Sequence, residues 1–172
     1  PKAEAVAAKV AGQFGTVMGL STLSGTPMEE VAQASSNSCW FQLYLCGGRE
    51  TALRGIARAK KAGFTALVLT IDTSVSGQRL VHARMKPWEA MRSWEGLTLQ
   101  QKLQSLRRII SLAPQMLPRL NWLLDFYADH GVMEFVNIID AEGKPMPFTD
   151  IGSQLAESAI TWSDLEWIKQ AW

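Results

Sequence analysis

Two short apolar segments, separated by a segment with helical spacing, constrain the fold of this chain more than any other feature. The apolar segments run from Trp40 to Leu45 and from Ala66 to Ile71. Between them, Leu53 and Ile56 lie on one face of a helix, and Gly63 provides its stop. Short apolar strands joined by a helix are typical of a parallel sheet that is covered on both faces. The pattern therefore predicts a strand, helix, strand unit of an α/β fold.

The N-terminal part of the chain continues this alternation. Residues 2–13 are rich in alanine, with valines at helical spacing, and residues 17–21 form a short apolar strand. Thr26, Pro27 and Glu29 then predict a helix start, in which the threonine caps, the proline occupies the first turn and the glutamate reaches back. The predicted order is therefore helix, strand, helix, strand before the next helix and strand follow.

A last helix is predicted near the C-terminus, where Ser163 and Glu166 have the spacing of a capping box. Alternating elements without long antiparallel signals favour a TIM (β/α)8 barrel. Such a barrel takes about 250 residues, whereas this chain has 172. Because it also begins at Pro1 and stops at Trp172, just after an apparent helix, we expect a partial TIM barrel that is an internal piece of a longer protein.

Residues 74–159 interrupt the alternation, being too long and too rich in proline for an ordinary loop. We expect one partial barrel domain over residues 1–172, with residues 74–159 as an elaborated active-site loop or insertion. Within it, residues 99–127 interleave leucine and isoleucine with lysine and arginine, which predicts two amphipathic helices split near Pro114. We favour helices that pack over the barrel mouth, and the alternative is a patch that contacts a membrane peripherally.

The balance of charge and the cysteines narrow the class of protein. Seventeen lysines and arginines against 16 acidic residues give a net charge of +1, so nucleic acid is not an expected partner and a small molecule is. No apolar run has the roughly 18 residues of a membrane span and no signal peptide is recognisable, so the expected location is cytoplasmic. Cys39 and Cys46 would lie roughly 23 Å apart along one strand, which predicts free thiols.

Polar residues follow the predicted strands at their carboxyl ends, where chemistry gathers in parallel barrels. By strand alternation, Gln42 and Tyr44 share one side, and so do Thr70 and Asp72. On the sequence alone, hydroxyl groups here could equally bond the nearby backbone and a tyrosine could simply pack. The candidate site residues are Ser21, Gln42, Tyr44, Thr70, Asp72 and Arg79.

These residues stand in segments that resemble a known family. The strings are GTVMGLSTLSGTPMEEVA, WFQLYL, AGFTALVLTIDTSVSGQR and ITWSDLEWIKQAW. They are similar to the FMN-dependent α-hydroxy acid dehydrogenases and oxidases, which include L-lactate dehydrogenase, glycolate oxidase and mandelate dehydrogenase. The resemblance covers residues 1–79 and 160–172 and is weak between them. It implies a flavoprotein with a barrel fold and FMN as its cofactor.

The resemblance also implies which residues bind FMN. It places Ser21, Gln42 and Thr70 against the flavin ring. The Gln42 amide offers both a donor and an acceptor, which suits a pyrimidine edge that presents both kinds of group.

Roles in catalysis and substrate binding follow from the same resemblance. Tyr44 would bind the reacting oxygen of the substrate, and Asp72 would stabilise a catalytic histidine that this chain does not contain. Arg79 would grip the substrate carboxylate with its planar fork. His82 and His130 match no catalytic position, and two separated histidines give no convincing metal site.

The expected function is oxidation of an L-2-hydroxy acid, such as L-lactate, to the 2-oxo acid by the parent enzyme. Leu23, at a substrate-facing position, and the sequence after Arg79 depart from the family pattern, so the exact hydroxy acid stays open. The electron acceptor is also open between oxygen, quinone, cytochrome and a peptide-derived redox carrier. We expect the parent to be a homo-oligomer that is cytoplasmic or peripheral to the inner membrane.

Two other functions compete with this one. The chain could be a non-catalytic barrel remnant or interaction module, since an incomplete parallel sheet has open edges that invite pairing. It could also belong to a different flavin-dependent barrel enzyme, such as an isopentenyl isomerase. The set of Tyr44, Asp72 and Arg79 argues against the second alternative, because a carboxylate-binding arginine would have no evident role there.

Overall fold

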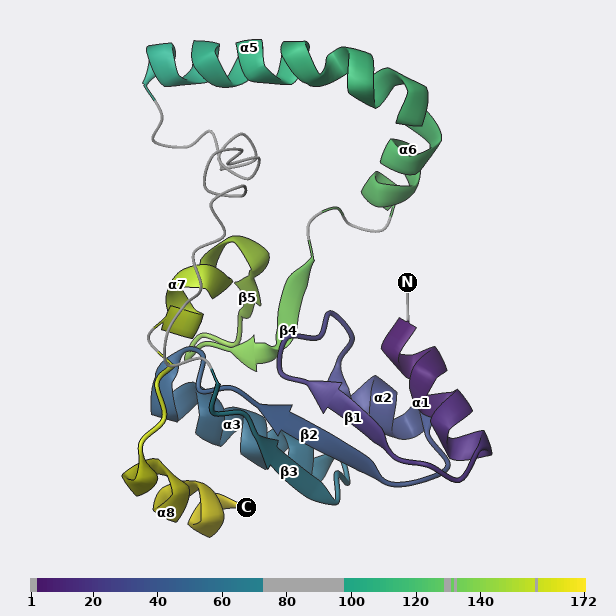
Figure 1. Ribbon diagram of the computed structural model, residues 1–172, viewed down its shortest axis with the longest axis vertical. Coiled ribbons are helices and arrows are strands. Elements are labelled where there is room, and N and C mark those ends of the chain that lie inside the picture. The colour runs from purple at the N-terminus through teal and green to yellow at the C-terminus, as the bar shows by residue number, and fades with distance from the viewer. Residues whose placement is uncertain (1–2, 73–97, 129–130, 132, 157) are drawn as a thin grey trace. The chain divides into compact units, whose positions relative to one another are not determined.

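The computed structural model describes residues 3–72, 98–128, 131, 133–156 and 158–172 (Figure 1). The chain divides into two compact units. The first, here called the sheet unit, comprises residues 1–76 and 132–172, and the second, here called the helical unit, comprises residues 77–131.

The sheet unit contains the predicted parallel strands. Strands β1 (Met18–Ser21), β2 (Cys39–Leu43) and β3 (Ala66–Leu69) lie in that order, and both pairs are parallel. The strands are shorter than predicted, yet the backbone ladder continues where Thr70 N–H donates to the Leu43 carbonyl (3.0 Å). The strand, helix, strand unit predicted from the sequence is therefore confirmed.

Four helices pack against one face of this sheet. They are α1 (Ala3–Gln13), α2 (Met28–Ala34), α3 (Gly48–Lys61) and α8 (Trp162–Ala171). Phe41 is buried in this core and meets Phe64 edge to face, with ring centroids 6.2 Å apart.

The other face of the sheet is more open. Trp40 and Val68 are 43% and 41% exposed, so alternation along the strands separates a packed face from a face that stays accessible.

Helix α2 begins differently from the prediction. Pro27 takes the N-cap position and makes no side-chain cap, and Met28 N–H instead donates to Asn137 Oδ1 (3.0 Å). Thr26 Oγ1 donates to Glu4 (2.6 Å) rather than to the backbone of the helix. The predicted threonine cap is therefore wrong. The distant Asn137 binds the first N–H of the helix, and Glu4 of α1 binds the Thr26 hydroxyl.

Glu4 connects α1 to the loop after β1. Its two carboxylate oxygens accept hydrogen bonds from the hydroxyl groups of Ser24 (2.9 Å) and Thr26 (2.6 Å). Burial raises the pKa of Glu4, but the hydrogen bonds, chiefly that from Thr26, outweigh burial and leave the pKa below its usual value.

The N-cap of the last helix lies two residues before the predicted one. Thr161 is its N-cap, and Thr161 N–H donates to Asp164 Oδ2 (2.8 Å), so the capping box joins Thr161 and Asp164 rather than Ser163 and Glu166. An aspartate three residues after the cap takes the role that the sequence pattern predicted for a glutamate.

An antiparallel hairpin lies in the segment that was predicted to be loop. Strand β4 (Glu134–Ile139) pairs with β5 (Pro145–Pro147), and a short 3-10 turn, η3 (Phe148–Asp150), leads into α7 (Ile151–Ala156). This hairpin is short, with only three residues in β5, and the sequence pattern did not predict it. In the turn between β4 and β5, Asp140 Oδ1 accepts hydrogen bonds from Glu142 N–H (3.0 Å) and Lys144 N–H (2.7 Å).

Two arginines of α3 and one asparagine of β4 attach this hairpin to the rest of the sheet unit. Arg54 Nε donates to the Ile139 carbonyl (3.1 Å), and Arg58 Nη1 donates to the Val136 carbonyl (3.1 Å). Asn137, only 3% exposed, donates to the Thr26 carbonyl (3.0 Å) as well as accepting from Met28. These contacts join residues far apart in the sequence, which explains why local patterns did not predict them.

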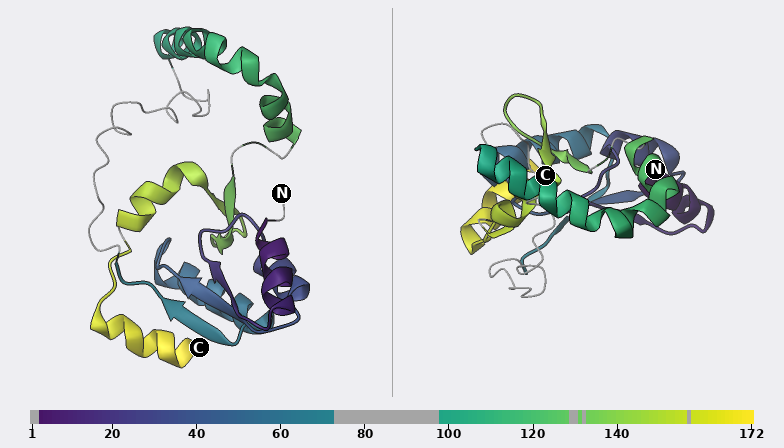
Figure 2. Two further views of the ribbon diagram at one scale, coloured as in Figure 1. Left: turned by 45° about the vertical axis from the view of Figure 1, so that its right-hand side comes forward. Right: turned by 90° about the horizontal axis from the view of Figure 1, so that it is seen from above.

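The helical unit contains α5 (Leu99–Met116), the 3-10 turn η2 (Leu117–Arg119) and α6 (Leu120–Ala128), which follow one another around a bend (Figure 2). The two predicted helices are present, but Pro114 lies inside α5 and the break falls at η2. The rings of Trp122 and Phe126 stack, with their centroids 5.3 Å apart. Among the described residues, none of the helices combines the length and the apolar character needed to cross a membrane.

Candidate functional site

A row of hydrogen-bonded side chains crosses the carboxyl ends of the three parallel strands. Ser21 Oγ donates to Gln42 Oε1 (2.9 Å), and Gln42 Nε2 donates to Thr70 Oγ1 (2.6 Å). Ser21 and Gln42 are register partners in β1 and β2, and Thr70 directly follows β3. The structure thus brings together the three residues that the family resemblance assigned to the flavin. We call Ser21, Gln42 and Thr70 the polar row.

The polar row is half-buried and keeps capacity for a ligand. The Gln42 amide uses one Nε2 proton toward Thr70 and has a second, and the Thr70 hydroxyl, which accepts this bond, still has its own proton to donate. A ligand edge with acceptor atoms therefore finds donors already oriented by neighbouring strands.

Thr22 supports the polar row from behind, and sequence reasoning missed it. Its hydroxyl donates to the Gln42 carbonyl (2.5 Å) and accepts from Tyr44 N–H (3.1 Å). Its own N–H donates to the same carbonyl (2.9 Å). Thr22 is only 3% exposed, so it ties the ends of β1 and β2 together. Its place directly after β1 is the one sequence signal that could have indicated this role.

Tyr44 and Asp72 lie within electrostatic range of each other. Burial raises the pKa of the Tyr44 phenol, and the charges of Asp72 and Cys46 raise it further. The phenol therefore keeps its proton at neutral pH. Asp72 itself is exposed just after β3, so its carboxylate remains accessible.

The two cysteines are free and buried, as predicted. Burial raises the pKa of the Cys46 thiol to about 11. Because the thiolate is the reactive form, Cys46 is not a candidate nucleophile.

Three other residues singled out from the sequence lie outside the described residues, namely Arg79, His82 and His130. In the part of the chain that the structure describes, no three histidine, cysteine, aspartate or glutamate side chains gather into a metal site.

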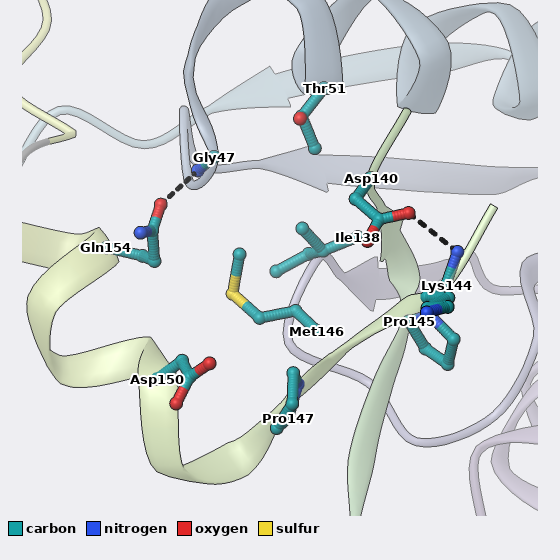
Figure 3. A pocket seen from close by; sticks show the side chains of 10 residues that line it. All are labelled: Gly47, Thr51, Ile138, Asp140, Lys144, Pro145, Met146, Pro147, Asp150 and Gln154. Carbon is teal, nitrogen blue, oxygen red and sulfur yellow. Dashed lines mark hydrogen bonds between the residues drawn. The ribbon is translucent and has the colours of Figure 1, made fainter. Parts of the chain in front are cut away.

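A pocket of about 270 Å³ opens between the first turn of α3, the hairpin and α7 (Figure 3). Gln154 Oε1 accepts from Gly47 N–H (3.0 Å) on one side, and Asp140 and Lys144 approach from the other. Met146 points into the space between them. Since this pocket carries both signs of charge, it does not single out one class of ligand, and no predicted site residue lines it.

Comparison with known proteins decides the family. The sequence model of the FMN-dependent dehydrogenases matches residues 1–172. This chain belongs to the FMN-dependent dehydrogenase family. The family resemblance predicted from the sequence is thereby confirmed, and FMN is the cofactor of this family.

Two relatives match nearly the whole chain. It is 33% identical to an L-lactate dehydrogenase of Xanthomonas campestris, over 99% of the chain and 41% of that protein. It is 31% identical to a pre-mycofactocin synthase of Mycobacterium tuberculosis, over 100% of the chain and 40% of that protein. The chain thus spans about two-fifths of the length of these relatives.

A solved structure supports the fold. The crystal structure of (S)-mandelate dehydrogenase, described as a monotopic membrane protein, matches with a TM-score of 0.66 and 26% identity. The match covers 100% of this chain and 42% of that enzyme. Together with the parallel strands β1 to β3, it confirms an α/β fold that forms part of a barrel.

Proposed function

We propose that the protein containing this chain oxidises an L-2-hydroxy acid similar to L-lactate to the corresponding 2-oxo acid. The observation that carries this proposal is the polar row, with Tyr44 and Asp72 beyond the ends of the same strands. The 33% identity to an L-lactate dehydrogenase supports the choice of substrate class. In this proposal residues 1–172 act as one partial barrel domain, with residues 74–159 as its elaboration.

The polar row would hold FMN through the polar edge of the flavin ring. Gln42 offers a donor that its neighbours have already oriented, and the Thr70 and Ser21 hydroxyl groups flank it. Bound FMN supplies the electron acceptor that takes up the two electrons lost by the hydroxy acid.

Tyr44 would donate a hydrogen bond to the reacting oxygen of the substrate. Burial favours its neutral form, so the phenol keeps the proton that this bond requires. Asp72 would stabilise a histidine supplied by the rest of the protein, because a carboxylate favours the positive charge that the histidine gains with the substrate's proton. Arg79 would hold the substrate carboxylate with two parallel hydrogen bonds.

Anaerobic flavin absorbance tests this function. The full-length protein with bound FMN is mixed in turn with L-lactate, glycolate and mandelate. We expect the flavin band to bleach, and to bleach more slowly in a Tyr44→Phe variant, which lacks the phenolic donor. We also expect the 172-residue chain alone to be inactive, because it lacks the proton-abstracting histidine. Bound FMN that none of the three acids bleaches would contradict the proposal.

We further propose that residues 99–127 contact a membrane peripherally, at its cytoplasmic face. Large apolar side chains of the helical unit are exposed, including Leu99 (74%), Leu124 (66%) and Trp122 (56%). Basic residues such as Lys102 and Arg107 alternate with them, which is typical of helices that lie in a membrane interface. The similar (S)-mandelate dehydrogenase is described as a monotopic membrane protein.

Vesicle sedimentation tests the membrane contact. We expect the protein to pellet with vesicles that contain anionic lipid, and Leu124→Glu to weaken this binding. Val6→Glu is a matched control, because Val6 is similarly exposed (61%) on a helix of the sheet unit. Equal binding by both variants would contradict the assignment of residues 99–127.

A further inference from the structure

We propose that the hairpin formed by β4 and β5 positions Leu23 and Tyr44 from behind and so limits the size of the 2-hydroxy acid that the site accepts. This inference rests on the proposed function, because Leu23 and Tyr44 are the residues expected to face the substrate. Phe135 and Ile138 of β4 are the positioning residues.

A second apolar core, separate from the one beneath the sheet, carries this inference. Its buried members are Cys46, Phe135 and Ile138, which are 1%, 3% and 2% exposed. Leu23 and Tyr44 pack against it. Both are half-buried, so one side of each rests on this second core while the remainder stays accessible.

A small cavity also links the site to the hairpin. Thr22 and Tyr44 line it together with Asn137 and Ile138 of β4. Its volume is only about 10 Å³, which is close to the minimum that holds one water molecule. Tyr44 therefore has little room to move without displacing β4, since close-packed interiors transmit changes in volume.

The hairpin itself is fixed against α3 and the segment before α2. Two arginines of α3, Arg54 and Arg58, donate to backbone carbonyl groups of β4. Asn137 of β4 in turn donates to the Thr26 carbonyl before α2. The Met133 side chain, just before β4, packs closely on Gly25. A Cβ atom added to Gly25 would lie only 2.9 Å from the Met133 side chain. Because the hairpin is held at several points, it can fix the positions of Leu23 and Tyr44, which pack against its core.

The polar row does not depend on this support. Its hydrogen bonds run between β1, β2 and the end of β3. Changes in the second core should therefore alter substrate choice and leave FMN binding unchanged.

Matched substitutions in the full-length holoenzyme test the inference. Phe135→Leu removes volume behind Leu23 and Tyr44, and Phe64→Leu removes the same volume from the core beneath the sheet. Ile138→Val and Ile56→Val form a milder pair in the same two cores, in case the phenylalanine variants fold poorly. For each variant, kcat/KM is measured for L-lactate and for L-mandelate, and the FMN dissociation constant is measured separately.

We expect Phe135→Leu to raise the ratio of kcat/KM for mandelate over lactate by about fivefold, because a single methylene in direct contact changes such ratios by about tenfold or more. Ile138→Val should change it in the same direction by less. Both control variants should leave the ratio unchanged, and FMN affinity should stay the same throughout. Ratios that do not differ between second-core and control variants would overturn the inference.

A structural readout accompanies the kinetics. Titration of ¹³Cζ-labelled tyrosine by NMR, with Tyr44→Phe to identify the signal, follows the Tyr44 phenol. We expect its pKa to fall toward the ordinary value in Phe135→Leu and not in Phe64→Leu, because burial is the main cause that raises it. If the parent enzyme oxidises no hydroxy acid, the proposed function fails. If it does so while neither specificity nor the Tyr44 signal changes, only the role of the hairpin fails.

Discussion

Replacing Asn137 by alanine should destabilise the sheet unit, because one side chain joins two distant parts of it. Asn137 extends from β4 and bonds two backbone groups at the start of α2. It donates to the Thr26 carbonyl and accepts from Met28 N–H, both at 3.0 Å. Alanine at this position leaves both backbone groups without these partners.

The magnitude follows from these two groups. Each buried polar group left unpaired costs about 1–3 kcal/mol, so the pair sets a range of about 2–6 kcal/mol. The adjoining cavity of about 10 Å³ would grow when the side chain is removed, and a water molecule could then restore one bond. We therefore expect Asn137→Ala to lower the free energy of unfolding by about 3 kcal/mol.

Asn37→Ala is a matched control. Asn37 also makes two hydrogen bonds through its amide, to the Thr16 carbonyl (3.1 Å) and from Ser38 N–H (2.8 Å), but it is exposed. Water can replace these partners, so we expect a loss below about 1 kcal/mol.

Urea unfolding, monitored through hydrogen exchange of the β2 amides, measures the free energy of unfolding of the sheet unit by itself. With a slope of about 2 kcal/mol per molar urea, the Asn137→Ala midpoint should fall by about 1.5 M. A midpoint equal to that of Asn37→Ala would refute the view that Asn137 holds β4 against α2.

Two further predictions concern acid stability and substrate affinity. The pKa of Glu4 is lower in the folded state than its usual value of 4.5, so its ionised form stabilises the fold above that pH and the stabilisation is lost as the pH falls through the folded pKa. Glu4→Gln should therefore flatten the dependence of stability on pH between about pH 5.5 and about pH 3. Arg79→Lys in the full-length enzyme should raise KM for the hydroxy acid, because a point charge replaces a planar fork, and an unchanged KM would remove Arg79 from the site.

Local sequence patterns predicted the parallel strands and their helices well. Apolar runs ending in polar residues identified β2 and β3, and parallel pairing then placed Gln42 beside Thr70. This worked because strand direction alone decides which edge the following residues reach.

Contacts between distant residues were the part that the sequence could not predict. Asn137 lies 109 positions from Met28, so the sequence around α2 could not indicate that Asn137 binds its first N–H. The hairpin was missed for a related reason, since its position depends on carbonyl groups of β4 that bind Arg54 and Arg58 of α3. The helix break was predicted near Pro114 and lies just beyond it, because α5 continues to Met116.

The FMN dissociation constant of a Gln42→Met variant tests the central claim most directly. Methionine has a similar length but cannot donate to the flavin or to Thr70, so the polar row loses its centre. Quenching of flavin fluorescence in the full-length apoprotein gives the constant for both forms. We predict that FMN binds the variant at least about tenfold more weakly, since each 1.4 kcal/mol changes affinity tenfold. Equal affinity would contradict the assignment of the polar row to the cofactor.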